Sequence, residues 1–260
     1  MAVDKLKVLF IAGWGRSGTT LLERILGEYE GFFATGELRY IWDRNMIENR
    51  LCGCGEKFYD CEIWKDIIQD AFGGPEGIDP REMLRIRESN LRSRHMPLLL
   101  IPSFKSAISR RMARLTDAIG GIYRSIAHTT GSNVIIDSSK FPSHGYTLSL
   151  IDDIELYVVH MMRDPRAVAH SWMNPKIQPD TGKMAPMKKV GPLKSSMLWN
   201  GWNMIADLMW SKHSESYLQI RYEDFVKAPA DTVEGILKML QVQPPNTPFL
   251  SQNEVQLGTN

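Results

Sequence analysis

The sequence predicts an α/β fold with three layers, in which a central parallel sheet is flanked by helices. Short runs of branched apolar residues alternate with longer amphipathic segments, as they do when helices connect parallel strands. The continuous apolar run Leu6–Ala12 is typical of a strand that is buried on both faces of a sheet. With 260 residues, 43% of them hydrophobic, the chain is long enough to form one such domain over residues 1–260.

Five strands are expected, and each is short and rich in β-branched or aromatic residues. Leu6–Ala12 is the first, and a short strand at Gly31–Thr35 follows the first helix. The other three strands are expected at Asn133–Asp137, Glu155–Met162 and Ser216–Arg221.

Helices are expected between these strands. One of them begins at Pro80, directly after the capping residue Asp79. The longest contains Gly120 and Gly121, a point at which it can break. Residues 38–130 contain no convincing strand and are predicted to be a helical insertion between the second and third strands. The expected helices are Gly18–Glu28, Pro80–Arg94, Ser103–Thr129, Pro165–Trp172, Ser195–Lys212 and Ala230–Leu240.

A glycine-rich turn follows the first strand. Residues Gly13 to Thr20 read Gly-Trp-Gly-Arg-Ser-Gly-Thr-Thr and lead into an amphipathic helix. Backbone N–H groups and the positive end of a helix dipole converge at such a turn, which suits a phosphate or sulfate group. The spacing is that of a P-loop, G-x-x-x-x-G-K-[ST], except that Thr19 replaces the lysine. The fold is therefore predicted to be P-loop-like, with Arg16 supplying the positive charge in the turn.

A second anion-binding segment begins where the strand Glu155–Met162 ends. Arg163 follows this strand, Pro165 starts a helix, and Ser171 lies about two turns into that helix. Ligands bind at the carboxyl ends of the strands in an open α/β sheet, so Arg163 and Ser171 are expected at the same edge as the glycine-rich turn. Taken alone, the segment also fits a local ion pair between Arg163 and Asp164.

Together, the two segments resemble those of the sulfotransferases that use 3′-phosphoadenosine 5′-phosphosulfate. The phosphosulfate turn of that family is similar to Gly15–Leu22, and its 3′-phosphate segment is similar to Arg163–Arg166 followed by Ser171. The likeness extends over nearly the whole chain and is strongest to the bacterial branch and to the tyrosylprotein and some carbohydrate sulfotransferases. It implies an enzyme that moves a sulfuryl group from this nucleotide to a hydroxyl acceptor and releases adenosine 3′,5′-bisphosphate.

The resemblance also implies roles for individual residues. Arg163 and Ser171 are expected to bind the 3′-phosphate, and Tyr222 is expected to lie near the nucleotide. Lys140 corresponds to a lysine that contacts the transferring group, and with Arg16 it would stabilise the charge that develops on the leaving phosphate. Because a sulfuryl group carries less charge than a phosphoryl group, no metal ion is expected. The residues expected to bind the 5′-phosphosulfate are Arg16, Ser17, Gly18, Thr19 and Thr20.

Glu37 is the candidate general base for the proton of the acceptor hydroxyl. It follows the short strand in the sequence Gly-Glu-Leu-Arg. The tyrosylprotein branch has Gly-Glu-Glu at this place, and its base is thought to be the second glutamate, where this chain has Leu38. The correspondence is therefore shifted by one residue. A structural role for Glu37, as the ion-pair partner of Arg39 or Arg16, is the alternative.

Other interpretations remain open. His144 is a weaker candidate for the base, whereas His160 is expected to be a buried structural histidine. A P-loop kinase or NTPase would use Asp137 to hold a metal ion, but the missing lysine and the segment after Arg163 argue against it. A third interpretation is an inactive nucleotide-binding scaffold, because a glycine- and arginine-containing loop found in related sequences is not reached before Asn260.

The three cysteines, Cys52, Cys54 and Cys61, lie in one segment with the spacing C-x-C-x6-C. This spacing raises a zinc hypothesis, but no fourth ligand lies nearby in the sequence. A compact loop without a metal is therefore favoured over a metal site or a labile disulfide.

Charge and hydropathy restrict the partners and the location. The net charge is +1, so a basic site has to be local and nucleic acid is not an expected partner. No secretory signal and no apolar run of transmembrane length is found, which favours a cytoplasmic protein without a membrane span. The lysine-rich loop at residues 174–194 is expected to cover an acceptor, which can be a small molecule, a carbohydrate, a lipid or a peptide. Candidates to line its pocket are Trp14, Trp42, Trp172 and Trp199.

Overall fold

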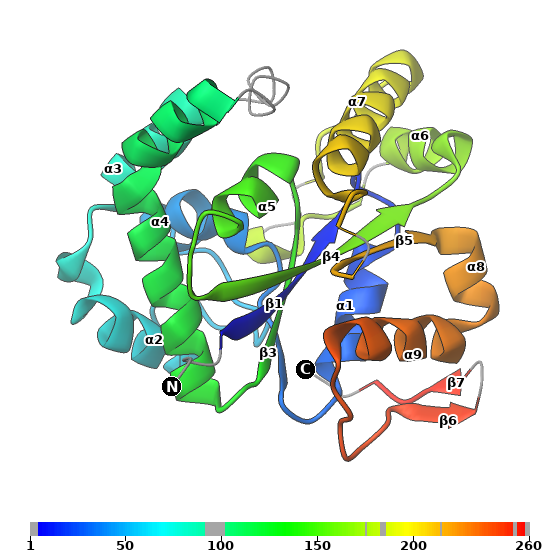
Figure 1. Ribbon diagram of the computed structural model, residues 1–260, viewed down its shortest axis with the longest axis horizontal. Helices are drawn as coiled ribbons and strands as arrows, with labels where there is room; N and C mark the ends of the chain where they lie inside the picture. The colour runs from blue at the N-terminus through cyan, green and yellow to red at the C-terminus, as the bar shows by residue number, and fades with distance from the viewer. Residues whose placement is uncertain are drawn as a thin grey trace.

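Five parallel strands form the central sheet (Figure 1), as the sequence predicts. The computed structural model describes residues 5–91, 102–174, 176–182, 186–213, 215–251 and 254–257, without the side chains of residues 102–105 and 179. The strand order is β2-β3-β1-β4-β5, and β1 pairs with both β3 and β4, with Val8 opposite Ile135 and Leu156. The strands are β1 (Leu6–Ala12), β2 (Phe32–Ala34), β3 (Val134–Lys140), β4 (Ile154–Met162) and β5 (Tyr217–Arg221).

Helices cover both faces of the sheet and bury two separate hydrophobic clusters. On one face, Leu9 and Ile11 of β1 pack with α1 (Thr19–Gly27), α8 (Tyr222–Lys227) and α9 (Pro229–Leu240). On the other face, Val8 and Phe10 pack with α4 (Pro102–Thr130), α5 (Pro142–Leu148) and α7 (Pro192–Trp210). This alternation along β1 follows from the two-residue repeat of a strand, and because both faces are buried the strand is apolar throughout.

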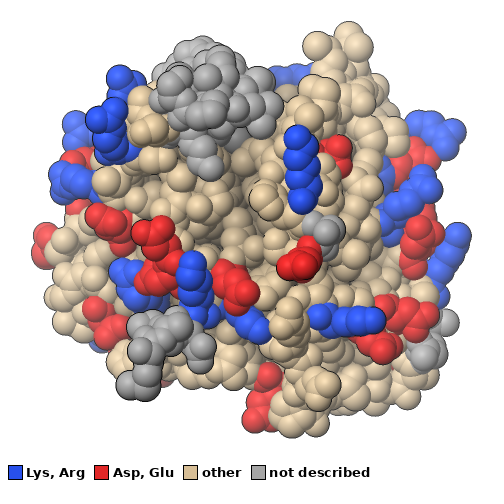
Figure 2. All heavy atoms as spheres, viewed as in Figure 1, with Lys and Arg blue, Asp and Glu red and all other residues tan. Residues whose placement is uncertain are grey.

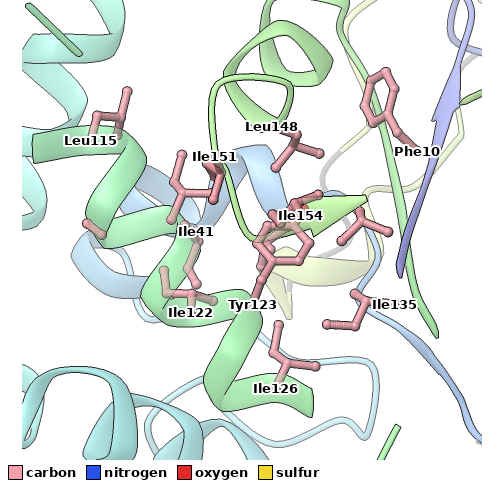
Figure 3. Close-up of a cluster of buried hydrophobic side chains, with 14 of the residues drawn as sticks. Phe10, Ile41, Leu115, Ile122, Tyr123, Ile126, Ile135, Leu148, Ile151 and Ile154 are labelled. Carbon is pink, nitrogen blue, oxygen red and sulfur yellow. The ribbon is translucent and has the colours of Figure 1, made fainter. Parts of the chain in front are cut away.

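The described residues between β2 and β3 form several helices, of which α4 packs against one face of the sheet. Figure 3 shows side chains of α4 facing Ile135 of β3 and Ile154 of β4. The predicted break in this helix at Gly120 and Gly121 is wrong, because α4 runs without interruption. The neighbouring Ile119 and Ile122 are buried, and burial of this apolar face outweighs the low helix propensity of two glycines. The described elements between β2 and β3 are η1 (Leu38–Tyr40), the π-helix η2 (Ile41–Ile47), α2 (Glu62–Phe72), η3 (Pro75–Gly77), α3 (Pro80–Asn90) and α4.

Other elements differ from the sequence prediction mainly at their ends. The helix α3 ends at Asn90, and the remainder of the predicted helix, residues 92–94, lies outside the described residues. The other described elements are α6 (Pro165–Met173), η5 (Pro179–Thr181) and an antiparallel pair of short strands, β6 (Phe249–Ser251) and β7 (Glu254–Val255), next to α9 (Figure 1). The sequence analysis did not predict α2, α5, α8 or this pair of strands.

Basic and acidic side chains are interspersed over the face shown in Figure 2. On α4, Arg114 forms an ion pair with Glu82 of α3, as expected for basic residues on a solvated helix face. In the described part of the chain, no helix combines the length and the hydropathy that crossing a lipid bilayer requires.

Candidate functional site

Polar residues at the carboxyl ends of the strands line a cavity of about 460 Å³. The turn Gly13–Thr20 follows β1, and Glu37 follows β2 after a short turn. Lys140 ends β3, Arg163 follows β4, and Tyr222 follows β5. Because all five strands are parallel, their carboxyl ends meet at one edge of the sheet, and residues far apart in the sequence are brought into one site. All the site residues predicted from the sequence line this cavity except Ser17, which lies in the same turn.

The glycine-rich turn is held close to the neighbouring strands. Gly18 has a φ of +89°, and a Cβ atom at this position would lie 2.4 Å from the ring of Tyr222. At Gly13, which has a φ of +137°, a Cβ atom would lie 2.4 Å from the backbone oxygen of Met161 in β4. No described side chain caps the start of α1 at Gly18, so the first N–H groups of this helix are available to an anion. The local sequence therefore forms a tight turn that Tyr222 packs against.

The two basic segments predicted from the sequence lie side by side. Arg163 donates a hydrogen bond from Nη1 to the backbone oxygen of Arg16, at 3.1 Å. The Arg163 guanidinium also lies over the ring of Tyr222, 4.3 Å from its centroid, and the Arg16 guanidinium lies 4.9 Å from the ring centroid of Trp172. Ser171, one residue before Trp172, lines the same cavity. Aromatic rings thus orient both guanidinium groups at one end of the sheet.

Glu37 forms an ion pair with Lys140 in this cavity. Lys140 Nζ also donates a hydrogen bond of 2.9 Å to the backbone oxygen of Ser138. The ion-pair partner of Glu37 is thus Lys140 and not Arg39, which lies over the ring of Phe141. Leu38, which occupies the position of the second glutamate in the tyrosylprotein branch, is buried in the hydrophobic core. Glu37 is therefore the carboxylate that this turn presents to the cavity.

The backbone of the site is strained at two cationic residues. Arg16 has a φ of +73° and Lys140 has a φ of +69°. The left-handed region is unfavourable for residues with long side chains, and such strain is concentrated at sites where a side chain has to point in a particular direction. In addition, burial lowers the pKa of Arg16, and the negative charge of Glu37 opposes this shift.

Glu23 is a buried carboxyl group that the sequence analysis missed. It lies on α1 and accepts hydrogen bonds from the backbone N–H of Gly36, at 2.7 Å, and from the hydroxyl of Ser138, at 2.6 Å. Burial raises its pKa to about 7. Glu23 thereby connects α1 to the turns that carry Glu37 and Lys140. A signal was present in the sequence, because a single acidic residue interrupts the apolar face of a helix.

The cavity contains basic residues that the sequence analysis did not predict. Arg44 and Lys176 also line it, so that five basic side chains and one carboxylate of the described residues face the same space. Two of the four tryptophans proposed for its wall, Trp14 and Trp172, are present, together with Trp202, which was not predicted. Trp42 belongs to the hydrophobic core instead, and Trp199 donates a hydrogen bond to the backbone oxygen of Arg163.

Part of the loop at residues 174–194 forms a wall of the cavity. Lys176 and Met187 face it, and Met187 Sδ accepts a hydrogen bond of 3.1 Å from Arg16. Residues 175 and 183–185 of this loop lie outside the described residues. The described part of the loop therefore reaches the glycine-rich turn.

Asp137 and His144 do not belong to this cavity. Asp137 is fully buried, accepts a hydrogen bond from the backbone N–H of Ser139 and contacts His144 Nε2 at 2.8 Å. The hydroxyl of Tyr123 also donates to Asp137. Neither Asp137, as a metal-holding residue of a kinase, nor His144, as a base, is therefore placed to act on a ligand in the cavity. The packing of α4 and α5 against the sheet buries both side chains.

His160 is a buried structural residue, as predicted. Its Nδ1 contacts the hydroxyl of Tyr217 at 2.8 Å, and its Nε2 contacts Oδ1 of Asn203 at 2.9 Å. Burial lowers its pKa. A neutral imidazole that joins β4, β5 and α7 in this way is a packing element.

Comparison with known proteins identifies the family. The model of the sulfotransferase family matches residues 9–245. The chain belongs to the sulfotransferase family. The resemblance seen in the sequence is thus confirmed at the level of the family, and the closer kinship to the tyrosylprotein and carbohydrate branches stays a prediction.

Solved structures of bacterial proteins share the fold of this sulfotransferase. The sulfotransferase domain from the curacin biosynthetic pathway matches with a TM-score of 0.52 and 17% identity, over 94% of this chain and 76% of that chain. The sulfotransferase STF1 from Mycobacterium tuberculosis H37Rv matches with a TM-score of 0.50 and 16% identity, over 93% of this chain and 69% of that chain. The comparison with curated proteins finds no match.

Proposed function

We propose that this sulfotransferase transfers the sulfuryl group of 3′-phosphoadenosine 5′-phosphosulfate to the hydroxyl group of an acceptor. The observation that supports this most directly is the contact between Arg163 and the backbone of Arg16. One nucleotide can reach two phosphate-binding segments only when they lie side by side. Its 5′-phosphosulfate would lie at the turn that contains Arg16, and its 3′-phosphate would lie at Arg163 and Ser171.

The residues of the turn fit an anionic donor. Arg16 Nε and Ser17 Oγ are buried, and neither has a hydrogen-bond partner among the described residues. A buried polar atom without a partner is costly, so these atoms suit a ligand that supplies oxygen acceptors. Gly15 and Gly18 let the rings of Trp172 and Tyr222 pack closely on the turn, because a Cβ atom at either position would meet one of these rings. Thr19 and Thr20 complete the turn with hydroxyl groups beside the start of α1.

The donor supplies an activated sulfuryl group, and the side chains of this chain would position the acceptor and neutralise charge. Glu37 would accept the proton of the acceptor hydroxyl, which makes the oxygen a better nucleophile. Lys140 holds the carboxylate of Glu37 in the cavity and faces the space where negative charge would develop. Arg16 and the N-terminal end of α1 would stabilise the phosphate that leaves.

Thermal unfolding with two different nucleotides tests the proposed donor. Adenosine 3′,5′-bisphosphate should raise the melting temperature, because a ligand at a hundred times its Kd adds about 2.7 kcal/mol of stability. ATP with magnesium should produce a smaller shift, since the P-loop lysine is replaced by Thr19. A larger shift with ATP and magnesium would contradict the proposal and favour a kinase or NTPase.

Transfer from a radiolabelled donor to a panel of hydroxyl compounds tests the reaction itself. The panel should include sugars, phenols, tyrosine peptides and lipid alcohols, because the acceptor class is open. Incorporation of label into any of them, without added metal, supports the proposal. Binding of the bisphosphate without incorporation, even in the presence of a broad panel, would indicate a nucleotide-binding scaffold.

A further inference from the structure

The loop between η2 and α2 brings the three cysteines of the chain together, away from the cavity. The sulfur atoms of Cys52, Cys54 and Cys61 all lie within 4.8 Å of one another. In a tetrahedral zinc site with Zn–S bonds of about 2.3 Å, the sulfurs lie roughly 3.8 Å apart. The observed group needs only a small contraction to reach this spacing.

The backbone of the loop holds the thiols in this position. The N–H of Cys52 donates to the oxygen of Glu56 at 2.7 Å, and the N–H of Gly55 donates to the oxygen of Cys52 at 3.0 Å. An antiparallel bridge between Leu51 and Lys57 closes the turn. The chain then returns, and Cys61 becomes the N-cap residue of α2. Two cysteines on a tight turn and a third at the start of a helix form a preorganised set of ligands.

Cys61 also belongs to the hydrophobic cluster that contains Phe58 and Trp64. The rings of these two residues pack with centroids 5.3 Å apart. The buried thiol of the group is therefore fixed by core packing.

Exposure differs among the three thiols in a way that suits a bound ion. Cys61 is buried, Cys52 is half-buried and Cys54 is exposed. The buried side shields the ion, and the exposed side leaves an entry path and room for a water molecule as the fourth ligand. Soft thiolate ligands select zinc over magnesium or calcium.

We propose that Cys52, Cys54 and Cys61 bind one zinc ion, with water as the fourth ligand. Binding converts each thiol to a thiolate and releases its proton to the solvent, with no change of oxidation state. The sequence alone favoured a compact loop, and the convergence of three sulfur atoms is the new observation that changes this interpretation.

The site would brace a segment that reaches the cavity. The N–H of Leu51, next to Cys52, donates to the backbone oxygen of Asp180 at 3.0 Å, and Arg50 donates to the carboxylate of Asp180 at 3.0 Å. Asp180 belongs to the same segment as Lys176, which lines the cavity. A metal ion at the cysteines would thus stabilise the loop on which this segment is anchored, without taking part in the transfer reaction.

Cobalt titration of the reduced full-length chain tests the site. We expect one Co²⁺ per chain and a thiolate-to-cobalt charge-transfer band, which zinc should abolish by displacement. Because the chain contains only three cysteines, this band can arise from no other thiols. Zinc should also raise the melting temperature of the wild-type protein.

Single substitutions separate this site from adventitious metal binding. Cys54→Ser changes an exposed residue, so the protein should stay folded while Co²⁺ binding weakens at least tenfold. Cys54 is chosen over Cys61 for this substitution because Cys61 is buried. Glu56→Gln is the matched control and should leave binding unchanged, since the substitution keeps the backbone oxygen that accepts a hydrogen bond from Cys52. The proposal would be overturned if the charge-transfer band were absent or if Cys54→Ser bound Co²⁺ as tightly as the wild-type protein. A disulfide in freshly purified protein would also overturn it. These results do not depend on whether the proposed transfer reaction is correct.

Discussion

The Nη1 atom of Arg163 lies 3.1 Å from the backbone oxygen of Arg16, although 147 positions separate the two residues in the sequence. This hydrogen bond joins the end of β4 to the turn after β1. It fixes the relative position of two cationic side chains before any ligand binds. Preorganisation of this kind lowers the entropic cost of binding a ligand that contacts both.

Replacement of Arg163 should weaken nucleotide binding. We expect Arg163→Ala to reduce the affinity for adenosine 3′,5′-bisphosphate by roughly 10- to 150-fold, since a hydrogen bond to a charged group contributes about 1.5–3 kcal/mol. Isothermal titration calorimetry measures this change, and circular dichroism verifies that the variant is folded. Arg166→Ala is the control, because Arg166 is exposed and pairs with Asp164. Equal affinities for the two variants would exclude Arg163 from the nucleotide site.

Replacement of Glu37 should reduce turnover much more than binding. Glu37→Gln can still accept a hydrogen bond from Lys140 but can no longer take a proton, so kcat should fall by about 10²- to 10⁴-fold. The Kd for adenosine 3′,5′-bisphosphate should change little. Glu30→Gln removes an exposed carboxylate beyond the end of α1 and should have wild-type kcat. A Glu37→Gln enzyme with nearly full activity would rule out Glu37 as the base.

Glu23 should make stability depend on pH. Burial raises its pKa from 4.5 to about 7, so between these values the folded chain keeps a proton that the unfolded chain has lost. The contribution of Glu23 to stability is therefore complete below pH 4.5 and is lost as the pH rises through 7. Glu23→Gln cannot ionise, and its stability relative to wild type should increase by roughly 2–3 kcal/mol between pH 5 and pH 8.

Urea unfolding at several pH values measures this difference for Glu23→Gln. The free energy of unfolding of the exposed control Glu30→Gln should differ from that of the wild type by the same amount at each pH. If the difference in free energy of unfolding between Glu23→Gln and wild type did not change with pH, Glu23 would be ionised throughout this range.

A methyl group at Gly18 should disturb both stability and binding. Gly131→Ala is the matched control, because Gly131 has a φ of +66° and no atom within 4 Å of the added Cβ, so it should lose only about 1–2 kcal/mol through backbone strain. Gly18→Ala carries similar strain, and its Cβ would also collide with Tyr222. We therefore expect a larger loss of stability for Gly18→Ala in urea unfolding.

The same pair of variants tests the position of Tyr222 beside the turn. Displacement of Tyr222 in Gly18→Ala should also weaken binding of adenosine 3′,5′-bisphosphate, and Gly131→Ala should bind normally. If Gly18→Ala bound the bisphosphate as well as wild type, the packing of Tyr222 on the turn would have no part in nucleotide binding.

Elements that depend on local sequence were the most predictable. The bounds of β1 were predicted residue by residue, and α1 within one residue at each end, because a buried strand, a glycine-rich turn and an amphipathic helix each leave a short-range pattern. The continuity of α4 was not predictable in the same way. Two glycines weaken a helix locally, whereas the packing that preserves it involves residues from several other elements.

By itself, the sequence determined the parallel sheet and the identity of the charged residues that follow its strands. Only the tertiary structure decided their neighbours. It paired Glu37 with Lys140, buried Glu23 beneath both, removed Asp137 from the cavity and gathered three sulfur atoms in one loop. The physical reason is that sequence patterns report the local backbone conformation and burial of a segment. Which side chains meet depends instead on how the layers and loops pack.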